Sequence, residues 1–405
     1  MQKFFGYPNG EKAGILLPRG DGAQNRTFNR RGEEYMRIGV TAEFVGTNAG
    51  GPETYCTNLI KRLGQCDTGN EYHIYVNQKS ARKQFSNLSE NVVPHHLFGG
   101  SRWIVVPIAQ PLAAALHGLD LFHATFAAPP LLPIRSVVTV CELGFEKHDD
   151  FYPPLMTYRL RRLHRRGTRR AERVLSISEY TKQDLIECYG LDPAVIDVIH
   201  WGVSERFKPA ASREETAQTI DRYKIREPYI LYVGKFEKRK NIPRLLKAYH
   251  LMKMESKHPH SLVLVGKRSY LFDDIDPTIE KLNMRRDVKI LENICRDDVV
   301  DLFKGASLFV FPSLLESFGI PPIEAMACGV PVVASSATAI PEIAGDAAYY
   351  CNPTNITDIA AAMNAVLEDN NVRTDLVAKG FKRAALFSWR NTVERTVEAY
   401  KKVLR

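Results

Sequence analysis

The stretch FPSLLESFGIPPIEAMACG, at residues 311–329, constrains the fold more than any other part of the chain. The apolar run SLFVF that leads into it is typical of a buried strand of a parallel sheet. Pro321 and Pro322 then open a helix, because proline is favoured in the first helical turn, and Gly329 ends it. A buried strand, a short loop and a helix in this order predict one βα unit of an open α/β sheet.

Two glutamates lie eight positions apart in this unit, Glu316 in the loop and Glu324 in the first helical turn. Both are therefore expected at the carboxyl end of the strand, which is where open α/β sheets bind ligands. The helix N-terminus beside them offers free N–H groups and a positive dipole end to a phosphate. The structural alternative is that Glu324 caps the helix and that Glu316 is a solvated loop residue.

The same strand–helix pattern recurs in two series along the chain. At 405 residues the chain is too long for one ordinary domain. We predict an α/β fold of two doubly wound Rossmann-like domains facing across a cleft, at residues 36–208 and 209–388, followed by a helix at residues 389–405. Residues 1–35 have no periodicity and are predicted to be a disordered extension, or an upstream mis-start before Met36.

Composition and cysteine spacing limit the class of protein. The chain is 44% apolar and 25% charged, as globular proteins are, and no long apolar run predicts a membrane-spanning helix. The N-terminal extension contains no apolar core of the signal-peptide kind. Seven cysteines are scattered singly, without metal-ligand spacing, which indicates free thiols in a reducing cytoplasm.

The formal charge of +9 is concentrated in one segment. The sequence RLRRLHRRGTRRAER, from Arg159 to Arg173, holds eight arginines against one glutamate. Such clustering favours a phosphate-bearing or membrane-surface partner, and Leu160 and Leu163 suit a segment that lies on anionic lipid. A solvated helix with local counter-charges explains the pattern equally well. Nucleic acid is not the expected partner, because no aromatic residues lie between the arginines.

Two loops are expected at the same edge of the sheets as Glu316. The first, KFEKRKN, follows the strand ILYVG, which ends at Gly234. Its cations are suited to neutralising a diphosphate, and they are Lys235, Lys238, Arg239 and Lys240. The second loop, in GTNAGGPETY, contains Gly50 and Gly51, which permit close backbone approach to a ligand or simply a tight strand–helix turn. The chain offers no acidic cluster for a divalent ion, so we predict a site with no metal and no cofactor, where cations and a helix N-terminus meet the leaving-group charge.

These segments resemble the retaining glycosyltransferases of family 4, whose fold is called GT-B. The resemblance covers roughly residue 36 to the C-terminus and is densest in the second half. It is carried by ILYVGKFEKRKNIPRLLKAY, LVLVGKR, FPSLLESFGIPPIEAMACGVPVVASSATAIPEIAGDAA and FSWRNTVERTVEAY. The family's E-x7-E element corresponds to Glu316 and Glu324. The resemblance also implies that the last helix crosses back onto the first domain.

The resemblance implies a role for each matching residue. Glu316 would contact the donor sugar and stabilise the developing oxocarbenium charge, and Glu324 would bind the ribose of the nucleotide. Lys235 and Lys240 would hold the diphosphate, with Arg239 as a second candidate. Many relatives have Arg where Lys235 stands, so a bidentate contact would become a point charge. The remaining donor-binding candidates are Gly50, Gly51, Gly234, Ser317, Phe318, Gly319 and Ile320.

One position departs from the family pattern. After the strand VVTV, relatives usually carry His, often His-Asp, near the reacting sugar, whereas this chain has Cys141 and Glu142. Cysteine cannot copy the two-sided hydrogen bonding of imidazole. Three explanations are open. The subfamily does not need the histidine, the backbone carbonyl at this position matters more than the side chain, or the transferase activity is weak or lost. His123, in LFHATF, is a partial replacement, so the catalytic candidates are Glu316, His123 and Cys141, although a lone His after a strand is more often structural.

The resemblance therefore implies transfer of a hexose from a nucleotide sugar to the hydroxyl group of a glycan or a lipid-linked glycan, at the cytoplasmic face of a membrane. GDP-mannose is the favoured donor, and a UDP-hexose is the next. No two carboxylates can be placed on opposite faces of a sugar, so a covalent double displacement is not supported. The alternative from another class is a non-catalytic nucleotide-sugar-binding subunit of a glycan assembly complex, which Cys141 motivates.

Overall fold

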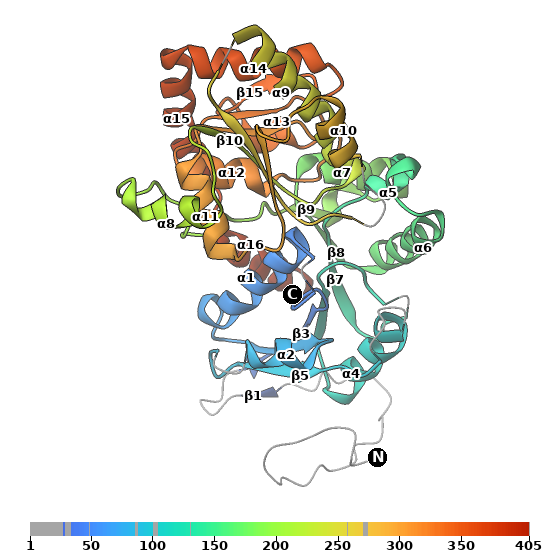
Figure 1. Cartoon of the computed structure of the whole chain (residues 1–405). Coiled ribbons are helices and arrows are strands. Elements are labelled where there is room, and N and C mark those ends of the chain that lie inside the picture. The colour runs from blue at the N-terminus through green and yellow to red at the C-terminus, as the bar shows by residue number, and fades with distance from the viewer. Residues whose placement is uncertain are drawn as a thin grey trace.

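The computed structural model describes residues 27–28, 34–47, 49–85, 88–99, 104–129, 131–256, 258–269 and 274–404. Figure 1 shows two α/β domains, the N-terminal one in blue to green and the C-terminal one in yellow to orange. Each is built on one sheet, and every strand pair in both sheets is parallel. The predicted α/β fold of two Rossmann-like domains is confirmed.

The N-terminal sheet has the order β5-β4-β3-β6-β7-β8-β9, in which the direction of strand addition reverses after β5, so that β6 lies on the other side of β3. Its strands are β3 (Arg37–Ala42), β4 (Glu71–Val76), β5 (Val92–His96), β6 (Leu121–Ala124), β7 (Arg135–Val140), β8 (Arg173–Ser176) and β9 (Ile196–Val198). Its helices are α1 (Gly51–Cys66), α2 (Lys79–Lys83), the π-helical η1 (Val105–Ala109), α4 (Gln110–Leu116), α5 (Gly144–Lys147), the 3₁₀ turn η2 (Asp149–Phe151), α6 (Pro154–Arg170), α7 (Glu179–Tyr189) and the 3₁₀ turn η3 (Pro193–Val195).

The C-terminal sheet repeats this arrangement with the order β12-β11-β10-β13-β14-β15. Its strands are β10 (Tyr229–Val233), β11 (Ser261–Val265), β12 (Val288–Leu291), β13 (Leu308–Phe311), β14 (Val332–Ser335) and β15 (Tyr349–Cys351). Its helices are α8 (Glu214–Arg222), the 3₁₀ turn η4 (Lys238–Lys240), α9 (Ile242–Ser256), α10 (Ile275–Lys281), α11 (Arg296–Gly305), α12 (Ile320–Ala327), α13 (Ile340–Ala344), α14 (Ile356–Glu368) and α15 (Asn370–Ala384).

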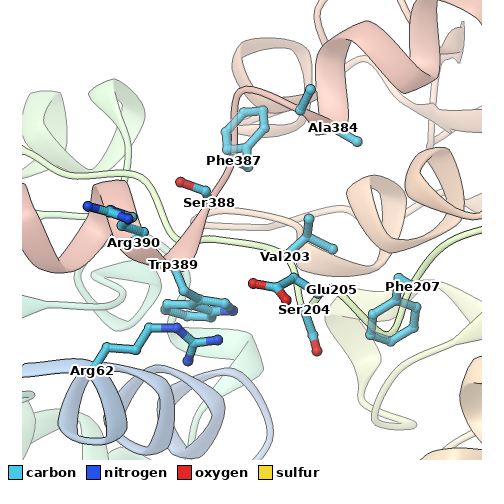
Figure 2. A pocket seen from close by; sticks show the side chains of 11 residues that line it. Arg62, Val203, Ser204, Glu205, Phe207, Ala384, Phe387, Ser388, Trp389 and Arg390 are labelled. Atoms are coloured by element: carbon cyan, nitrogen blue, oxygen red, sulfur yellow. The ribbon is translucent and has the colours of Figure 1, made fainter. Parts of the chain in front are cut away.

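The last helix, α16 (Trp389–Leu404), returns to the N-terminal domain, where it packs on α1 and β8. The chain thus passes between the domains twice, and the two connections touch each other. Val203 N–H donates to the Phe387 carbonyl over 3.0 Å, and a Cβ added to Gly202 would overlap the Trp389 nitrogen at 2.1 Å. Figure 2 shows a pocket between these connections, with Arg62 of α1 beside it. Any movement of one domain against the other would have to be accommodated by these two connections.

Part of the predicted N-terminal extension is described. Thr27–Phe28 (β1) and Glu34–Tyr35 (β2) pair as a short antiparallel ladder, which departs from the expected disorder. Residues 1–26 and 29–33 of that extension lie outside the described residues.

Candidate functional site

The loop after β13 and the start of α12 form the centre of the site. All four residues of β13 are buried, so the chain can reach the surface only where the strand ends. Gly319 is the N-cap of α12 and has a φ of 105°, which residues other than glycine rarely adopt. A Cβ built there would lie 2.6 Å from Ile340 Cδ1, so space also requires glycine. The predicted strand, loop and helix follow one another at the carboxyl edge of the sheet.

Glu316 lies in this loop with its carboxylate buried and paired. Its Oε1 accepts a hydrogen bond from Lys240 Nζ, and its Oε2 lies 3.6 Å from Arg239 Nη1. The backbone is fixed as well, because Glu316 N–H donates to Thr338 Oγ1 over 3.1 Å. Arg239 Nη1 also donates to the Leu315 carbonyl over 3.3 Å. The structure thus brings two of the predicted basic residues onto the first predicted glutamate.

Charges from both domains meet at Arg239. Glu142, the second residue after β7 of the N-terminal domain, lies 4.0 Å from Arg239 Nη2, and Glu237 lies 2.9 Å from Arg239 Nε. Burial works against the charge on Arg239, yet Glu142 and Glu316 raise its pKa. Burial lowers the pKa of Lys240, against the attraction of Glu316. The two cations and three carboxylates form one network, so the charge of each depends on the others.

Glu324 lies in the second turn of α12, because the helix begins at Ile320, and its expected position in the first turn is wrong. The helix starts two residues before Pro322, with Pro321 in its first turn, so the carboxylate is too far along to cap it. Burial raises the pKa of Glu324 to about 7, with Arg296 opposing. Among the residues that the structure describes, no group forms a hydrogen bond or ion pair with this carboxylate. It is therefore available to accept hydrogen bonds from the hydroxyl groups of a ligand.

The glycine loop of the N-terminal domain faces the basic loop of the C-terminal one. Gly50 has a φ of 79°, and a Cβ built on it would lie 3.6 Å from Lys235 Cε. Gly51 opens α1, where an added Cβ would lie 3.1 Å from the Trp201 ring. Glu53 fixes the loop by accepting hydrogen bonds from two of its N–H groups at 2.8 and 2.9 Å. Lys235 is half-buried at this meeting point of the two domains.

The remaining predicted donor-binding residues lie around the same loops. Gly234 N–H donates to the Val265 carbonyl over 2.9 Å, so it is not available to a ligand. The buried Phe318 ring packs on Trp201, with ring centroids 5.7 Å apart, and Ile320 begins α12.

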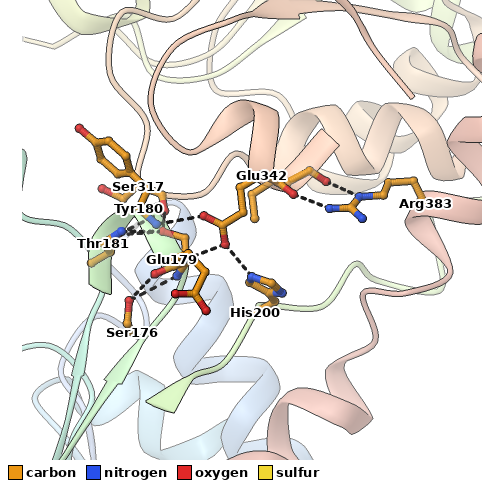
Figure 3. Close-up of polar contacts among 10 residues, drawn as sticks. Ser176, Glu179, Tyr180, Thr181, His200, Ser317, Glu342 and Arg383 are labelled. Carbon is orange, nitrogen blue, oxygen red and sulfur yellow. Dashed lines mark hydrogen bonds and ion pairs between the residues drawn. The ribbon is translucent and has the colours of Figure 1, made fainter. Parts of the chain in front are cut away.

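Polar contacts join the two domains beside Ser317 (Figure 3). Ser178 Oγ, at the N-cap of α7, donates to the Ser317 carbonyl over 2.7 Å. Glu342 of α13 accepts hydrogen bonds from the first two N–H groups of α7, at 2.7 and 3.0 Å, where its charge meets the positive end of the helix dipole. His200 Nε2 lies 2.8 Å from the same carboxylate. Burial works to raise the pKa of Glu342, but these hydrogen bonds lower it overall.

His123 lies outside the site, and its catalytic interpretation is corrected here. The side chain is fully buried in β6, with Nδ1 2.6 Å from the Tyr400 hydroxyl of α16 and Nε2 2.8 Å from Thr139 Oγ1. Burial lowers its pKa to about 3, so the ring is neutral at physiological pH. With both nitrogens engaged inside the sheet, His123 joins α16 to the N-terminal domain and cannot reach a substrate.

Cys141 directly follows β7, near the site but turned into the protein. Its side chain is buried, and Sγ lies 3.6 Å from the Thr125 carbonyl. Burial raises the pKa of this thiol well above its usual range, so it stays protonated at neutral pH. A catalytic role for the Cys141 side chain as a base or nucleophile is therefore not supported by its surroundings.

Sequence reasoning did not select Glu142, Glu237, Glu342, His200 or Ser178 as site residues. Glu142 could have been found, because it is the second residue after a predicted strand and belongs to the Cys141-Glu142 pair that departs from the family pattern. Glu342 and His200 could not, since they are 142 residues apart and meet only where the two domains join.

Two family descriptions together match most of the chain. Residues 49–207 match Glycosyltransferase Family 4, and residues 215–383 match Glycosyl transferases group 1. The O-antigen chain mannosyltransferase B of Escherichia coli is 31% identical over 66% of this chain and 70% of its own length. The serotype-specific mannosyltransferase WbdA of Escherichia coli is 32% identical over 58% of this chain, which spans only 29% of that longer protein.

Solved structures share the fold. Anabaena Alr3699/HepE in complex with UDP-glucose superposes with a TM-score of 0.73 at 16% identity, covering 91% of this chain and 100% of that one. Among the described residues, none of the helices is both long and apolar enough to cross a membrane.

Proposed function

The chain belongs to the glycosyl transferases of group 1, and from this we propose that it transfers mannose from GDP-mannose to a hydroxyl group of a glycan or lipid-linked glycan, with retention at the anomeric carbon. Family membership makes it a hexosyltransferase that takes a nucleotide sugar as substrate and needs no metal cofactor. Mannose and a polymeric acceptor are supported by the O-antigen chain mannosyltransferase and the serotype-specific mannosyltransferase that it resembles.

The observation that carries the proposal is the buried contact of Glu316 with Lys240 and Arg239 in the loop that opens α12. In the proposal, the diphosphate of the donor draws these cations toward its own charge. Glu316 is then free to face the sugar, where a carboxylate stabilises positive charge at the anomeric carbon. One buried network can thus respond to the donor and act on the reacting sugar.

The surrounding residues have separate roles in the proposal. Glu324, which lacks a protein partner among the described residues, accepts hydrogen bonds from the ribose hydroxyls. Lys235 supplies a second cation for the diphosphate, and Gly50 lets the backbone of the other domain approach it. Because these groups come from both domains, a closed arrangement aligns donor and acceptor and excludes water.

Two alternatives rest on specific observations. A UDP-hexose donor is favoured by the likeness to a protein solved with UDP-glucose, although that likeness concerns the fold. A non-catalytic nucleotide-sugar-binding subunit is favoured by Cys141, which stands where relatives usually carry histidine and which turns away from the site. This second alternative predicts donor binding without turnover for any acceptor.

The experiment is a thermal-shift and calorimetric panel of GDP, UDP, ADP and their common sugar conjugates, with and without EDTA, followed by product analysis. We expect GDP and GDP-mannose to stabilise the protein, EDTA to change nothing, and NMR of the product to give an α-linked mannoside. A preference for UDP would reassign the donor. Donor binding without transfer to mannan-type oligosaccharide or lipid-linked acceptors would favour the non-catalytic alternative.

We further propose that α6 rests on anionic lipid, where a lipid-linked acceptor would be found. Leu160 is buried, but the first two turns of α6 expose Leu155, Met156 and Tyr158 by 62, 38 and 56%. Several arginines of the helix are used within the protein; Arg169, for example, donates to the Tyr189 carbonyl. The exposed arginines are Arg159, Arg162, Arg165, Arg166, Arg169 and Arg170. An apolar first turn followed by exposed cations suits the surface of a membrane.

A second apolar surface supports the same proposal. Ile104, the N-cap of η1, Ile108 of η1, and Leu112 and Leu116 of α4 recur every four residues and are 44 to 58% exposed. The test is co-sedimentation with vesicles of phosphatidylglycerol and of phosphatidylcholine. Charge reversal of Arg162 and Arg166 to Glu should release the protein from anionic vesicles, whereas reversal of the exposed Lys247 and Lys281 in the other domain should not. Equal effects of both pairs would contradict an α6 surface.

A further inference from the structure

Three histidine side chains gather on the N-terminal sheet, in a region that the transfer reaction does not use. A nitrogen atom of each of His73, His95 and His117 lies within 4.8 Å of the others. His73 Nδ1 and His95 Nε2 are already 2.9 Å apart. Tetrahedral zinc ligands, at about 2.1 Å from the metal, lie about 3.4 Å from one another. The His95 and His117 rings are stacked with centroids 4.3 Å apart, so metal binding requires the rings to rotate until their nitrogens face one point.

The sheet places these side chains together. Alternation along β4 puts Glu71, His73 and Tyr75 on one face, and Tyr75 lies opposite His95 in the β4–β5 register. His117 is the C-cap of α4, in the short loop that leads to β6 at Leu121. His73 is buried, while His95 and His117 are half-buried. The cluster is thus part of the domain and still open to solvent on one side.

Neighbouring groups orient two of the rings as metal-binding proteins orient their ligands. Glu71 Oε1 lies 2.8 Å from His73 Nε2, on the side of the ring away from His95. Tyr75 Oη lies 2.7 Å from His117 Nδ1, so a proton on Nδ1 leaves the lone pair on Nε2. A carboxylate or hydroxyl group behind a histidine fixes its tautomer and raises its basicity toward a metal.

We propose that His73, His95 and His117 form a binding site for one Zn²⁺ ion or a similar divalent transition-metal ion. Imidazole nitrogens suit such ions, and three of them with a water molecule complete a tetrahedral set. With the His73 proton on Nε2, toward Glu71, the proton in the hydrogen bond between the two rings belongs to His95 Nε2. When the metal binds, this proton moves to His95 Nδ1, so that His73 Nδ1 and His95 Nε2 both present lone pairs to the ion.

The site is structural and separate from sugar transfer. α4 ends at the amino edge of the parallel sheet, whereas Gly50 and Cys141 lie at its carboxyl edge, beside the C-terminal domain. A metal would tie the edge strand β5 and the end of α4 to β4. This role does not conflict with a transfer reaction that needs no metal.

The test uses the full chain without a polyhistidine tag, after removal of metals with EDTA. We expect one equivalent of Zn²⁺ to bind and to raise the melting temperature, and Co²⁺ to give visible d–d bands without the near-ultraviolet charge transfer of thiolate ligands. His95→Gln and His117→Gln should each weaken binding by about tenfold or more, as Glu71→Gln should through His73. His96→Gln is the matched control, because His96 is the next residue of β5 and points to the other face, toward the Asn77 carbonyl.

Three outcomes would overturn the proposal: no binding of Zn²⁺ or Co²⁺, binding that His95→Gln and His117→Gln leave unchanged, or a cobalt spectrum with thiolate charge transfer, which would assign the metal to cysteines. Circular dichroism of each variant separates loss of the site from loss of folding. If His117→Gln does not fold, His95→Gln alone keeps the comparison with His96→Gln.

Discussion

At the scale of single residues, the site depends on one buried carboxylate with two cationic neighbours. We expect Glu316→Gln to lower the rate of transfer by several orders of magnitude with little change in nucleotide affinity. Glutamine keeps a hydrogen-bond acceptor for Lys240 but cannot stabilise positive charge on the sugar. Turnover and nucleotide calorimetry on the same sample test this. Glu237→Gln is the control, because it removes another carboxylate that contacts Arg239 and should lower the rate of transfer far less. Near-normal turnover of Glu316→Gln would contradict the role assigned to Glu316.

Lys240 should respond differently, because it serves both the fold and the ligand. Lys240→Ala leaves the Glu316 carboxylate buried with one cation fewer, so we expect a loss of about 3 kcal/mol of unfolding free energy. GDP affinity should fall as well. Lys235→Ala is the comparison, because Lys235 is half-buried and forms no ion pair within the described residues; it should weaken GDP binding with little change in stability. Denaturant unfolding and calorimetry separate the two effects, and unchanged GDP affinity in both variants would count against a basic diphosphate site.

Removing the charge of Glu324 should raise the stability of the protein at alkaline pH and lower its affinity for the nucleotide. Burial raises its pKa to about 7, above the usual value near 4.5, so the folded protein binds a proton more tightly than the unfolded chain does. This carboxyl group therefore lowers stability progressively as pH rises from about 4.5 to 7, and the loss persists above pH 7. Glu324→Gln removes this cost, so its melting temperature should exceed the wild-type value at pH 8 and match it near pH 4.5, while nucleotide affinity falls. A lower melting temperature at pH 8 would contradict the assignment.

At the scale of elements, the start of α12 depends on one glycine. Gly319→Ala should cost more stability than its φ alone explains, because the added Cβ would meet Ile340 at 2.6 Å. Gly190→Ala is the matched control: Gly190 ends α7 with a φ of 64° and has nothing within 4 Å of an added Cβ. The control should lose about 1 kcal/mol of unfolding free energy. We expect Gly319→Ala to lose clearly more unfolding free energy than Gly190→Ala and to bind the donor more weakly. Equal losses in the two variants would show that the protein relieves the contact with Ile340 without a cost in stability.

Helices and strands could be predicted from the sequence better than the contacts between side chains that are distant in the chain. Apolar runs such as SLFVF and ILYVG identify buried strands because the central strands of a parallel sheet are covered on both faces. His123 shows the limit of such reasoning: its strand was predicted, but its partner Tyr400 comes from a helix 277 residues later. The histidine cluster was missed for the same reason, since His73 and His95 meet only through the register of β4 on β5. Glu324 was placed one turn early because proline marks the first turn of a helix without fixing its first residue.

At the scale of the whole molecule, two of the ionic contacts that join the domains should differ greatly in importance. Lys238 and Asp150 pair over 3.0 Å, but both side chains are 59% exposed, so this contact should contribute little. Glu342 instead accepts two N–H groups of α7 and lies against His200, with only 21% of its side chain exposed. The closed arrangement should therefore depend on Glu342 and hardly at all on Lys238.

We expect Glu342→Gln to increase hydrogen exchange at the first turn of α7 and to lower kcat, whereas Lys238→Met should leave both nearly unchanged.

The contact of Glu342 with α7 also predicts that domain closure depends on pH. Because the hydrogen bonds made in the closed form lower the pKa of Glu342, closure is favoured above the pKa that this carboxyl group has in the open form. Closure weakens as pH falls toward the lower pKa of the closed form, when the carboxylate takes up a proton. Small-angle scattering of the wild type should thus show a larger radius of gyration at acidic than at neutral pH, and Glu342→Gln should remove most of that difference. If the variant retained the full pH response, closure would have to be controlled by another titrating group.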